Sequence, residues 1–182
     1  MSEDDAIGEG PAAEFTRYWL QRRPDLEPDA LAMALTLARA HLLDMKSVSR
    51  IAERHDVTST DYSLMATIQR GRRQGPIRPS DLSRMFNLQP SLVTYRIGQL
   101  VERGLVERAP MTGDRRVVLL ALTPQGAAIV DAIVTAIAER AGERMAALDA
   151  FPDGRRTLQQ LLSAVVKRWE QLDDATDETA VR

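Results

Sequence analysis

The spacing of hydrophobic residues divides this chain into amphipathic helices that are interrupted once by a short extended segment. Apolar positions repeat every three or four residues over 80–86 and 90–103, which predicts two short helices. Gly104 ends the second helix, and residues 105–108 and the apolar run 117–122 flank a polar turn. Two helices followed by a β-hairpin are the element order of a winged helix-turn-helix. The first functional hypothesis is therefore binding of double-stranded DNA.

Helices are also predicted on both sides of this segment. A short helix beginning near Ala13 ends before Pro24, and a longer one begins near Asp29. Beyond the hairpin, Thr123 suits the N-cap and Pro124 the first position of another long helix, and a last helix follows a Pro-containing break. The predicted fold class is mainly α with a small β-hairpin, a winged helix-turn-helix with long N- and C-terminal dimerisation helices.

The pattern predicts five parts along the chain. Residues 1–12 are polar and acidic and are expected to form a disordered tail, and 173–182 form a second tail. The N-terminal helices occupy 13–58, the DNA-binding domain 59–122, and the C-terminal dimerisation helices 123–172.

Two shorter features are predicted at the start of the DNA-binding domain. The run Ser59–Asp61 is expected to cap a helix that continues to about Arg73. After it, Ile77 and Arg78 are long enough only for a minimal strand.

The apolar seams of the outer helices predict a homodimer. Their residues recur at spacings of four and three, which is the spacing of a helix surface that packs against another helix. These faces are larger than the small basic module can cover, and a symmetric dimer would bury them. A monomeric bundle packed on itself is the alternative. The predicted interface residues are Leu31, Leu35, Leu42, Leu162, Val165 and Trp169.

Charge is distributed unevenly along the chain. The formal net charge is −2, yet residues 70–116 hold ten Arg and only four acidic residues, a net of +6. The remaining residues must then sum to −8. A basic segment that coincides with the helix-turn-helix pattern favours contact with DNA phosphates over an ordinary solvated surface.

The second helix of the motif has two distinct faces. At 100° per residue, Val93, Ile97 and Leu100 share one face and should be buried. The outward residues offer hydroxyls, an amide and an aromatic edge that can meet bases or phosphates in a major groove. The predicted DNA-binding residues of this helix are Ser91, Thr94, Tyr95 and Gln99. Gly98, also on the outward side, suggests close approach of another backbone, such as that of DNA.

The hairpin turn adds two more candidates. Arg115 and Arg116 place two guanidinium groups at or near its tip, where they suit phosphate and a narrow minor groove. Gly113 allows the tight turn, and Asp114 is expected to hold one of the two arginines in place.

Composition argues against other classes of function. Without cysteine, the chain can form neither disulfides nor thiolate metal sites, and His41 and His55 lack metal-ligand spacing. No phosphate-binding Gly loop, catalytic residue, metal site or bound cofactor is predicted, so an enzyme is disfavoured.

No apolar run approaches the length of about 20 residues that a membrane span needs. We therefore expect a cytoplasmic protein without a membrane partner. The stronger rival is a winged-helix protein-interaction module that does not bind specific DNA.

A series of short motifs resembles a known family. Asp81-Leu-Ser, Gly104-Leu-Val-Glu-Arg, Gly113-Asp-Arg-Arg and Leu122-Thr-Pro-Gln-Gly occur in the order and spacing of the MarR family of bacterial transcription regulators. The resemblance covers roughly residues 28–172. It implies a homodimer that binds a pseudo-palindromic operator, with a small-molecule pocket between the dimer helices and the DNA-binding lobe. Occupation of that pocket usually releases DNA, as in a ligand-responsive repressor.

A narrower resemblance concerns the N-terminal helix. Trp19, the following Gln21–Leu26 and Arg96 look like the urate-responsive branch of that family. The resemblance implies that Trp19 and Arg96 bind a small planar anionic effector through ring stacking and guanidinium donors. The alternative for Trp19 is a packing ring that holds the extra helix to the body.

Overall fold

A computed structural model gives the fold over residues 11–74, 77–111 and 114–180, and the side chains of 11–12, 72–74, 109–111, 114–117 and 173–180 are not described. The chain forms two compact units, one ending at Val134 and the other beginning at Thr135.

The first unit begins with two helices joined by a tight turn. Helix α2 (Pro11–Arg22) packs against α3 (Pro28–Glu53), and Ala13 and Thr16 of α2 are buried in the contact. In the turn, Arg23 donates two hydrogen bonds to Asp25, at 2.6 and 2.7 Å, which lowers the pKa of the Asp25 carboxyl. Pro28 then starts α3, as its fixed φ favours at a first helical position.

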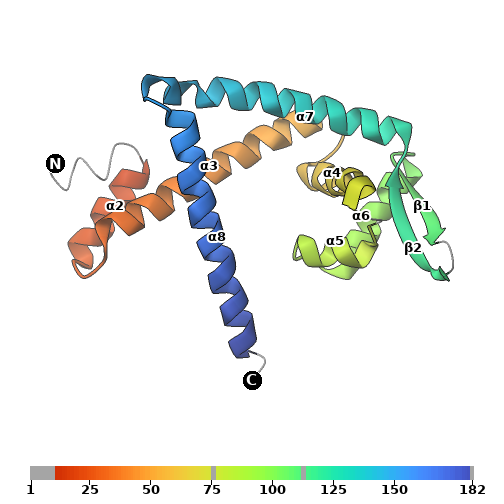
Figure 1. Ribbon diagram of the computed structural model, residues 1–182, viewed down its shortest axis with the longest axis horizontal. Helices are drawn as coiled ribbons and strands as arrows, with labels where there is room; N and C mark the ends of the chain where they lie inside the picture. The colour runs from red at the N-terminus through yellow and green to blue at the C-terminus, as the bar shows by residue number, and fades with distance from the viewer. Residues whose placement is uncertain (1–10, 75–76, 112–113, 181–182) are drawn as a thin grey trace. The chain divides into compact units, whose positions relative to one another are not determined.

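Three further helices form the body of the winged helix-turn-helix. They are α4 (Ser59–Gln74), α5 (Pro79–Met85) and α6 (Pro90–Glu102), which lie together beside the hairpin (Figure 1). Their shared core is aliphatic. It contains the fully buried side chains of Leu64, Met65, Ile68, Leu82, Val93, Ile97 and Leu100. The helices predicted at 80–86 and 90–103 are confirmed to within a residue.

The wing is a two-stranded antiparallel hairpin. Strand β1 (Val106–Met111) pairs with β2 (Asp114–Leu122), with Val106 opposite Leu122 and an irregularity between Pro110 and Met111. Ile77 adds an isolated bridge to Leu120, which confirms the minimal strand predicted there. Both strands extend nearer the tip than predicted, because Asp114 already pairs with Met111.

Two glycines fix the path of the chain around the hairpin. Gly104 has φ +70°, a left-handed conformation that ends α6 and turns the chain into the wing. Gly126 lies in the first turn of α7 (Pro124–Met145), where an added Cβ would collide with the Leu105 carbonyl oxygen. The predicted N-cap is confirmed, because the Gly126 amide donates to Thr123 Oγ1 at 3.0 Å. The base of the wing and the start of α7 are therefore packed backbone to backbone.

The second unit contains the end of α7, the short 3-10 helix η1 (Ala146–Ala150) and α8 (Gly154–Ala180). Arg155 donates two hydrogen bonds to Asp149, at 2.6 and 2.7 Å, across the turn between η1 and α8. Asp153 in that turn has φ +52°. This is the break that the sequence predicted between the last two helices.

Helices α2 and α8 extend into the two ranges predicted as tails. Helix α2 begins at Pro11, inside the range 1–12 predicted as a disordered tail, and residues 1–10 lie outside the described part. Helix α8 continues to Ala180, inside the range 173–182 predicted as the second tail. Over the described ranges, no helix is both long and apolar enough to cross a membrane.

Candidate nucleic-acid interface

Helix α6 has one buried and one exposed face, as its sequence predicts. Val93, Ile97 and Leu100 are at most 1% exposed and anchor the helix on the core. The four side chains predicted to contact DNA all lie on the exposed side: Ser91, Thr94, Tyr95 and Gln99. The largest of them, Tyr95, is 63% exposed, so most of its side chain faces solvent. The helix therefore presents hydroxyl and amide groups to solvent from a rigid support.

Helix α5 holds the N-terminal end of α6 in place. Asp81 caps α5 by accepting a hydrogen bond from the Arg78 amide at 3.0 Å, and it also pairs with Arg84 at 3.1 Å. Asn87, at φ +48°, then reverses the chain between the two helices. This compact turn places the exposed Arg84 guanidinium beside the exposed face of α6.

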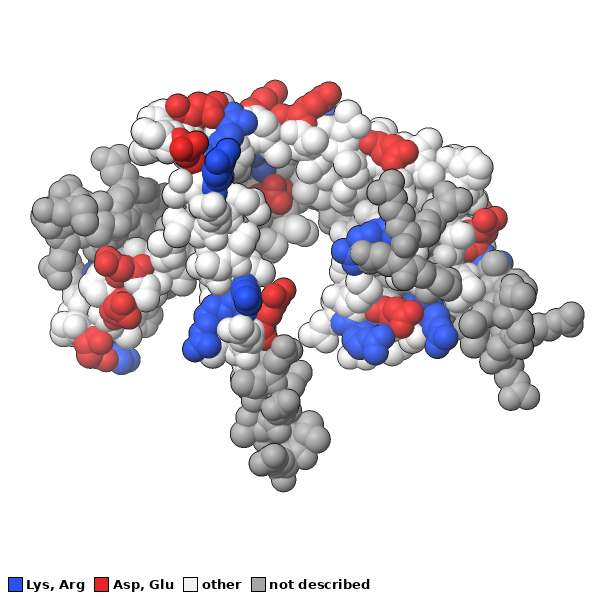
Figure 2. Space-filling model, viewed as in Figure 1, with Lys and Arg blue, Asp and Glu red and all other residues white. Residues whose placement is uncertain are grey.

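A surface groove lies between the two helices. Its volume is about 420 Å³, and its lining combines small polar side chains, prolines and one guanidinium. The lining residues are Pro79, Ser80, Ser83, Arg84, Pro90 and Thr94. Figure 2 shows Lys and Arg side chains grouped on this part of the visible face, with acidic side chains between them. The groove offers hydroxyl and guanidinium donors of the kind that bind phosphate oxygens.

Two details refine the exposed face of α6. Gly98 has open space where a Cβ would be added, so the backbone there is accessible from outside. Gln99 donates from Nε2 to Glu102 at 3.2 Å on the same surface. A base edge that binds Gln99 would therefore compete with this intrahelical bond.

Arg96 is engaged inside the protein. Its Nη1 donates to Thr58 Oγ1 at 3.2 Å and to the two carboxylate oxygens of Asp61 at 3.2 and 3.4 Å. Its side chain is 30% exposed and that of Asp61 only 11%, and the buried Nε of Arg96 has no hydrogen-bond partner among the described residues. The sequence predicted that Arg96 binds an anionic ligand, and it gave no indication of this ion pair with Asp61.

The partners of Arg96 form the N-terminal cap of α4. Thr58 Oγ1 accepts a hydrogen bond from the Asp61 amide at 3.1 Å, and the Thr58 amide donates to Asp61 at 3.3 Å. The cap predicted at Ser59 therefore lies one residue earlier. The signal was present as a Thr-x-x-Asp spacing, since a capping box pairs an N-cap hydroxyl with an acidic side chain three residues later.

A second arginine, which the sequence did not indicate, also bonds within the protein although its side chain is exposed. Arg103, the C-cap residue of α6, donates from Nη2 to the Asp56 carbonyl oxygen at 2.7 Å. Asp56 lies in the turn between α3 and α4. No local sequence pattern indicates this contact, because its acceptor is a backbone atom 47 residues away.

The wing candidates are described only in part. Asp114, Arg115 and Arg116 lie in β2, next to the hairpin tip, but their side chains are outside the described set. Gly113 lies outside the described residues altogether. The ion pair expected between Asp114 and a neighbouring arginine remains a prediction.

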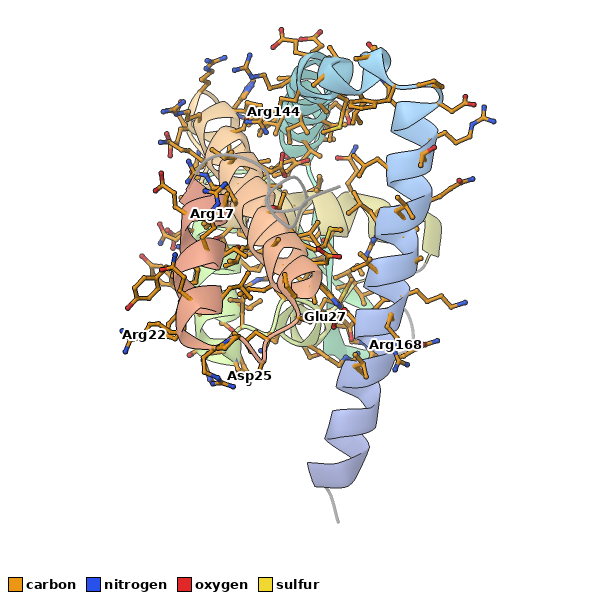
Figure 3. The ribbon with its side chains drawn as sticks, turned by 90° about the vertical axis from the view of Figure 1, so that its left-hand side faces the viewer. Arg17, Arg22, Asp25, Glu27, Arg144 and Arg168 are labelled. Carbon is orange, nitrogen blue, oxygen red and sulfur yellow. The ribbon has the colours of Figure 1, made fainter. Side chains whose placement is uncertain are left out.

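The two predicted effector residues have separate partners. Trp19 contacts the rings of Phe15 and Tyr18 on its own helix, with centroids 6.1 and 5.6 Å away, and is 38% exposed. Within the described part of the chain, no interaction joins Trp19 to Arg96. In Figure 3, Arg17 and Arg22 extend from α2, while Asp25 and Glu27 lie in the turn to α3. Basic and aromatic side chains thus share the surface of α2, where Arg22 lies 5.8 Å from the Tyr18 ring centroid.

The predicted dimer seams are largely exposed. On α3, Leu31 and Leu35 are half-buried and Leu42 is 62% exposed. On α8, Leu162 and Val165 are half-buried and Trp169 is 52% exposed. Each unit therefore carries a helix face whose apolar side chains are incompletely covered.

Comparison with known proteins bears on the identity of this fold. Residues 57–118 match the MarR family model. The chain is 27% identical over 156 residues to the HTH-type transcriptional regulator PecS of Dickeya dadantii, covering 85% of this chain and 92% of the relative. It is 34% identical over 76 residues to the multiple antibiotic resistance protein MarR of Salmonella typhimurium, 42% of this chain and 51% of the relative. These relatives are transcription regulators rather than enzymes.

Solved structures show the same fold. The multiple antibiotic resistance repressor MarR superposes with a TM-score of 0.62 at 25% identity, over 71% of this chain and 91% of the other. A MepR variant of S. aureus bound to an oligodeoxyribonucleotide superposes with a TM-score of 0.52 at 17% identity. This match covers 75% of this chain and 96% of the other. Together with the exposed face of α6 and the adjoining wing, these matches show a winged helix-turn-helix fold in which residues 57–118 match the MarR family model.

Proposed function

We propose that the protein is a sequence-specific, ligand-responsive repressor that acts as a homodimer on a pseudo-palindromic operator. The observation that carries this proposal is the exposed face of α6. Its hydroxyl, amide and phenol groups project from a helix whose other face is fully buried. Such a rigid helix can enter a major groove and read the edges of bases.

The parts of the interface have different roles in this proposal. Ser91, Thr94, Tyr95 and Gln99 of the recognition helix α6 contact base edges and nearby phosphates. Arg115 and Arg116 of the wing contact the backbone or the minor groove, since guanidinium suits both. Phosphate contacts give affinity and position, while base contacts give sequence preference.

The homodimer follows from the exposed apolar faces of α3 and α8. A two-fold symmetric dimer would bury both seams and would present two copies of α6 to successive major grooves. Half-sites of such an operator are about one helical turn apart, so operator symmetry reflects protein symmetry.

The effector is a small planar anion, with Trp19 and Arg96 as its anchors. Such an anion would have to replace the carboxylate of Asp61 as the partner of Arg96. Because Arg96 belongs to α6, a change of partner would alter the position of the recognition helix. A ligand of this kind shifts DNA binding only as far as its affinities for the two states differ.

Base-contact variants test the DNA-binding role. We expect Ser91→Ala or Gln99→Ala to relax the preference at particular bases of the operator, at a cost of roughly 1–3 kcal/mol for each good contact. Gln159→Ala is a matched control, because Gln159 is also exposed and also bonds to a side chain on its own helix, at 3.3 Å from Ser163. If both α6 variants keep the base preference of the wild type, α6 is not the helix that recognises the bases.

Titration with urate, salicylate and related aromatic acids tests the effector role. Active ligands should raise the melting temperature of the wild type, quench its Trp fluorescence and weaken operator binding. Arg96→Ala should lose these responses relative to its own ligand-free baseline. Equal responses in both proteins would exclude Arg96 as the anchor. The absence of any response at millimolar concentration would reject the anionic effector.

A further inference from the structure

Helix α6 is fastened to the turn between α3 and α4 by two arginines. Arg96 reaches Thr58 and Asp61 at the end of this turn, and Arg103 reaches the Asp56 carbonyl. The two arginines are seven residues apart, which is nearly two helical turns, so they extend from the same side of α6. This side adjoins the buried face, away from Ser91 and Tyr95.

The acceptor of Arg103 is held in a defined direction. Asp56 has φ +57°, and the turn is closed by hydrogen bonds from the Asp56 amide to Glu53 at 3.1 Å and from the Val57 amide to Ala52 at 3.3 Å. Val57 is only 3% exposed and anchors the turn on the core. The Asp56 carbonyl is therefore a fixed point at the end of α3, since a C-terminal turn of this kind depends on its left-handed residue.

We propose that Arg103 is a positioning residue, which sets the orientation of the recognition helix by binding the α3–α4 turn and makes no contact with DNA. With Arg96 it forms a two-point attachment, and the second point, nearly two turns along the helix, resists pivoting of α6 about the first. The orientation of α6, and hence the match of Ser91 and Gln99 to bases, then depends on the end of α3.

The side of α6 from which the two arginines extend also determines which charges DNA meets. Both arginines extend from the side of α6 that lies away from Ser91 and Tyr95, so we expect neither to replace a counterion on a phosphate. The salt dependence of binding should come from Arg84 of α5 and from the wing. Arg84 differs from Arg103 because it lines the groove between α5 and α6, with a side chain that is 81% exposed.

The test compares Arg103→Ala with Arg84→Ala in DNA binding at several salt concentrations. Arg103→Ala should lower operator affinity roughly tenfold, the scale of one lost charge-assisted hydrogen bond, with non-specific affinity and the salt slope unchanged. Arg84→Ala should instead reduce the slope by about one unit. A reduced slope for Arg103→Ala would show that its guanidinium binds phosphate and would overturn the proposal.

A double-mutant cycle identifies the acceptor. Asp56→Gly keeps the left-handed turn and should leave operator affinity unchanged, whereas Asp56→Val strains the turn and redirects its carbonyl. Combined with Arg103→Ala, Asp56→Val should cost no more than either change alone. Asp153→Val is the control, because Asp153 has a similar φ of +52° and its carbonyl is not the acceptor of Arg103. Additive losses for Asp56→Val would contradict the proposal.

The inference rests on the proposed DNA-binding function, so one measurement is made without DNA. Amide hydrogen exchange along α6 in the free protein should accelerate in Arg103→Ala and stay unchanged in Arg84→Ala. If the wild type has no sequence preference, the proposed function fails while this exchange result still tests the attachment. If exchange along α6 is the same in both variants, the attachment itself is wrong.

Discussion

Gly126 illustrates how a single missing side chain determines the position of a helix. A Cβ at this residue would meet the Leu105 carbonyl, a backbone atom that cannot move without shifting the base of the wing. We expect Gly126→Ala to lower the free energy of unfolding by about 1–3 kcal/mol, the usual cost of overpacking. Chemical denaturation of the purified variant measures this difference.

Gly142 provides the matched control on the same helix. An added Cβ there meets nothing within 4 Å, so Gly142→Ala should stabilise the protein by up to about 1 kcal/mol through helix propensity alone. Destabilisation of equal size in both variants would mean that the close packing at Leu105 does not exist in solution.

Gly98 differs from both, because its surroundings are open in the isolated chain. Gly98→Ala should stabilise the fold by up to about 1 kcal/mol, as at Gly142. If DNA approaches the α6 backbone closely, the same change should weaken operator binding by roughly tenfold. Thermal melting of Gly98→Ala gives the change in stability, and titration with operator DNA gives the change in affinity. A more stable protein with unchanged DNA affinity would show that this glycine has no role in contact with DNA.

At the scale of elements, the sequence predicts most of the winged helix-turn-helix. The periodicity of Val93, Ile97 and Leu100, the left-handed Gly104 and the cap at Thr123 are local signals, and local physics fixes what they form. The partners of Arg96 and Arg103 were not predicted. They depend on which loop the tertiary fold brings beside α6, and neither spacing nor charge along the chain contains that information.

The wing is the element whose charge should dominate the salt dependence of binding. Replacing Arg115 and Arg116 together by Ala should weaken binding to all sequences and flatten the plot of log affinity against log salt, since each lost phosphate contact removes about 0.9 from the slope. Fluorescence anisotropy at several salt concentrations measures both effects. The control for net charge is the double variant Arg155→Ala/Arg156→Ala. It removes another adjacent arginine pair, which lies at the start of α8. An unchanged slope in the wing variant would reject the wing as a DNA contact.

At the scale of the whole molecule, the exposed seams predict assembly. Sedimentation at micromolar concentration should give about twice the 20.2 kDa of one chain. Leu42→Asp should shift this equilibrium toward the monomer, because Leu42 is 62% exposed and its loss costs the isolated chain little. Met33→Asp is the control, since Met33 is 60% exposed on the same helix but lies about 200° around the axis from Leu31. A wild-type monomer at this concentration would contradict the dimer.

The most direct test of the central claim is selection of genomic DNA fragments by the purified protein, followed by sequencing of the fragments it retains. A dimer that reads DNA through two copies of α6 should enrich one pseudo-palindromic motif with half-sites about one helical turn, or 10–10.5 base pairs, apart. Affinity for that motif should exceed affinity for a scrambled sequence by at least about 10³-fold. Retention of fragments without any common motif, with equal affinity for the scrambled sequence, would contradict a sequence-specific regulator.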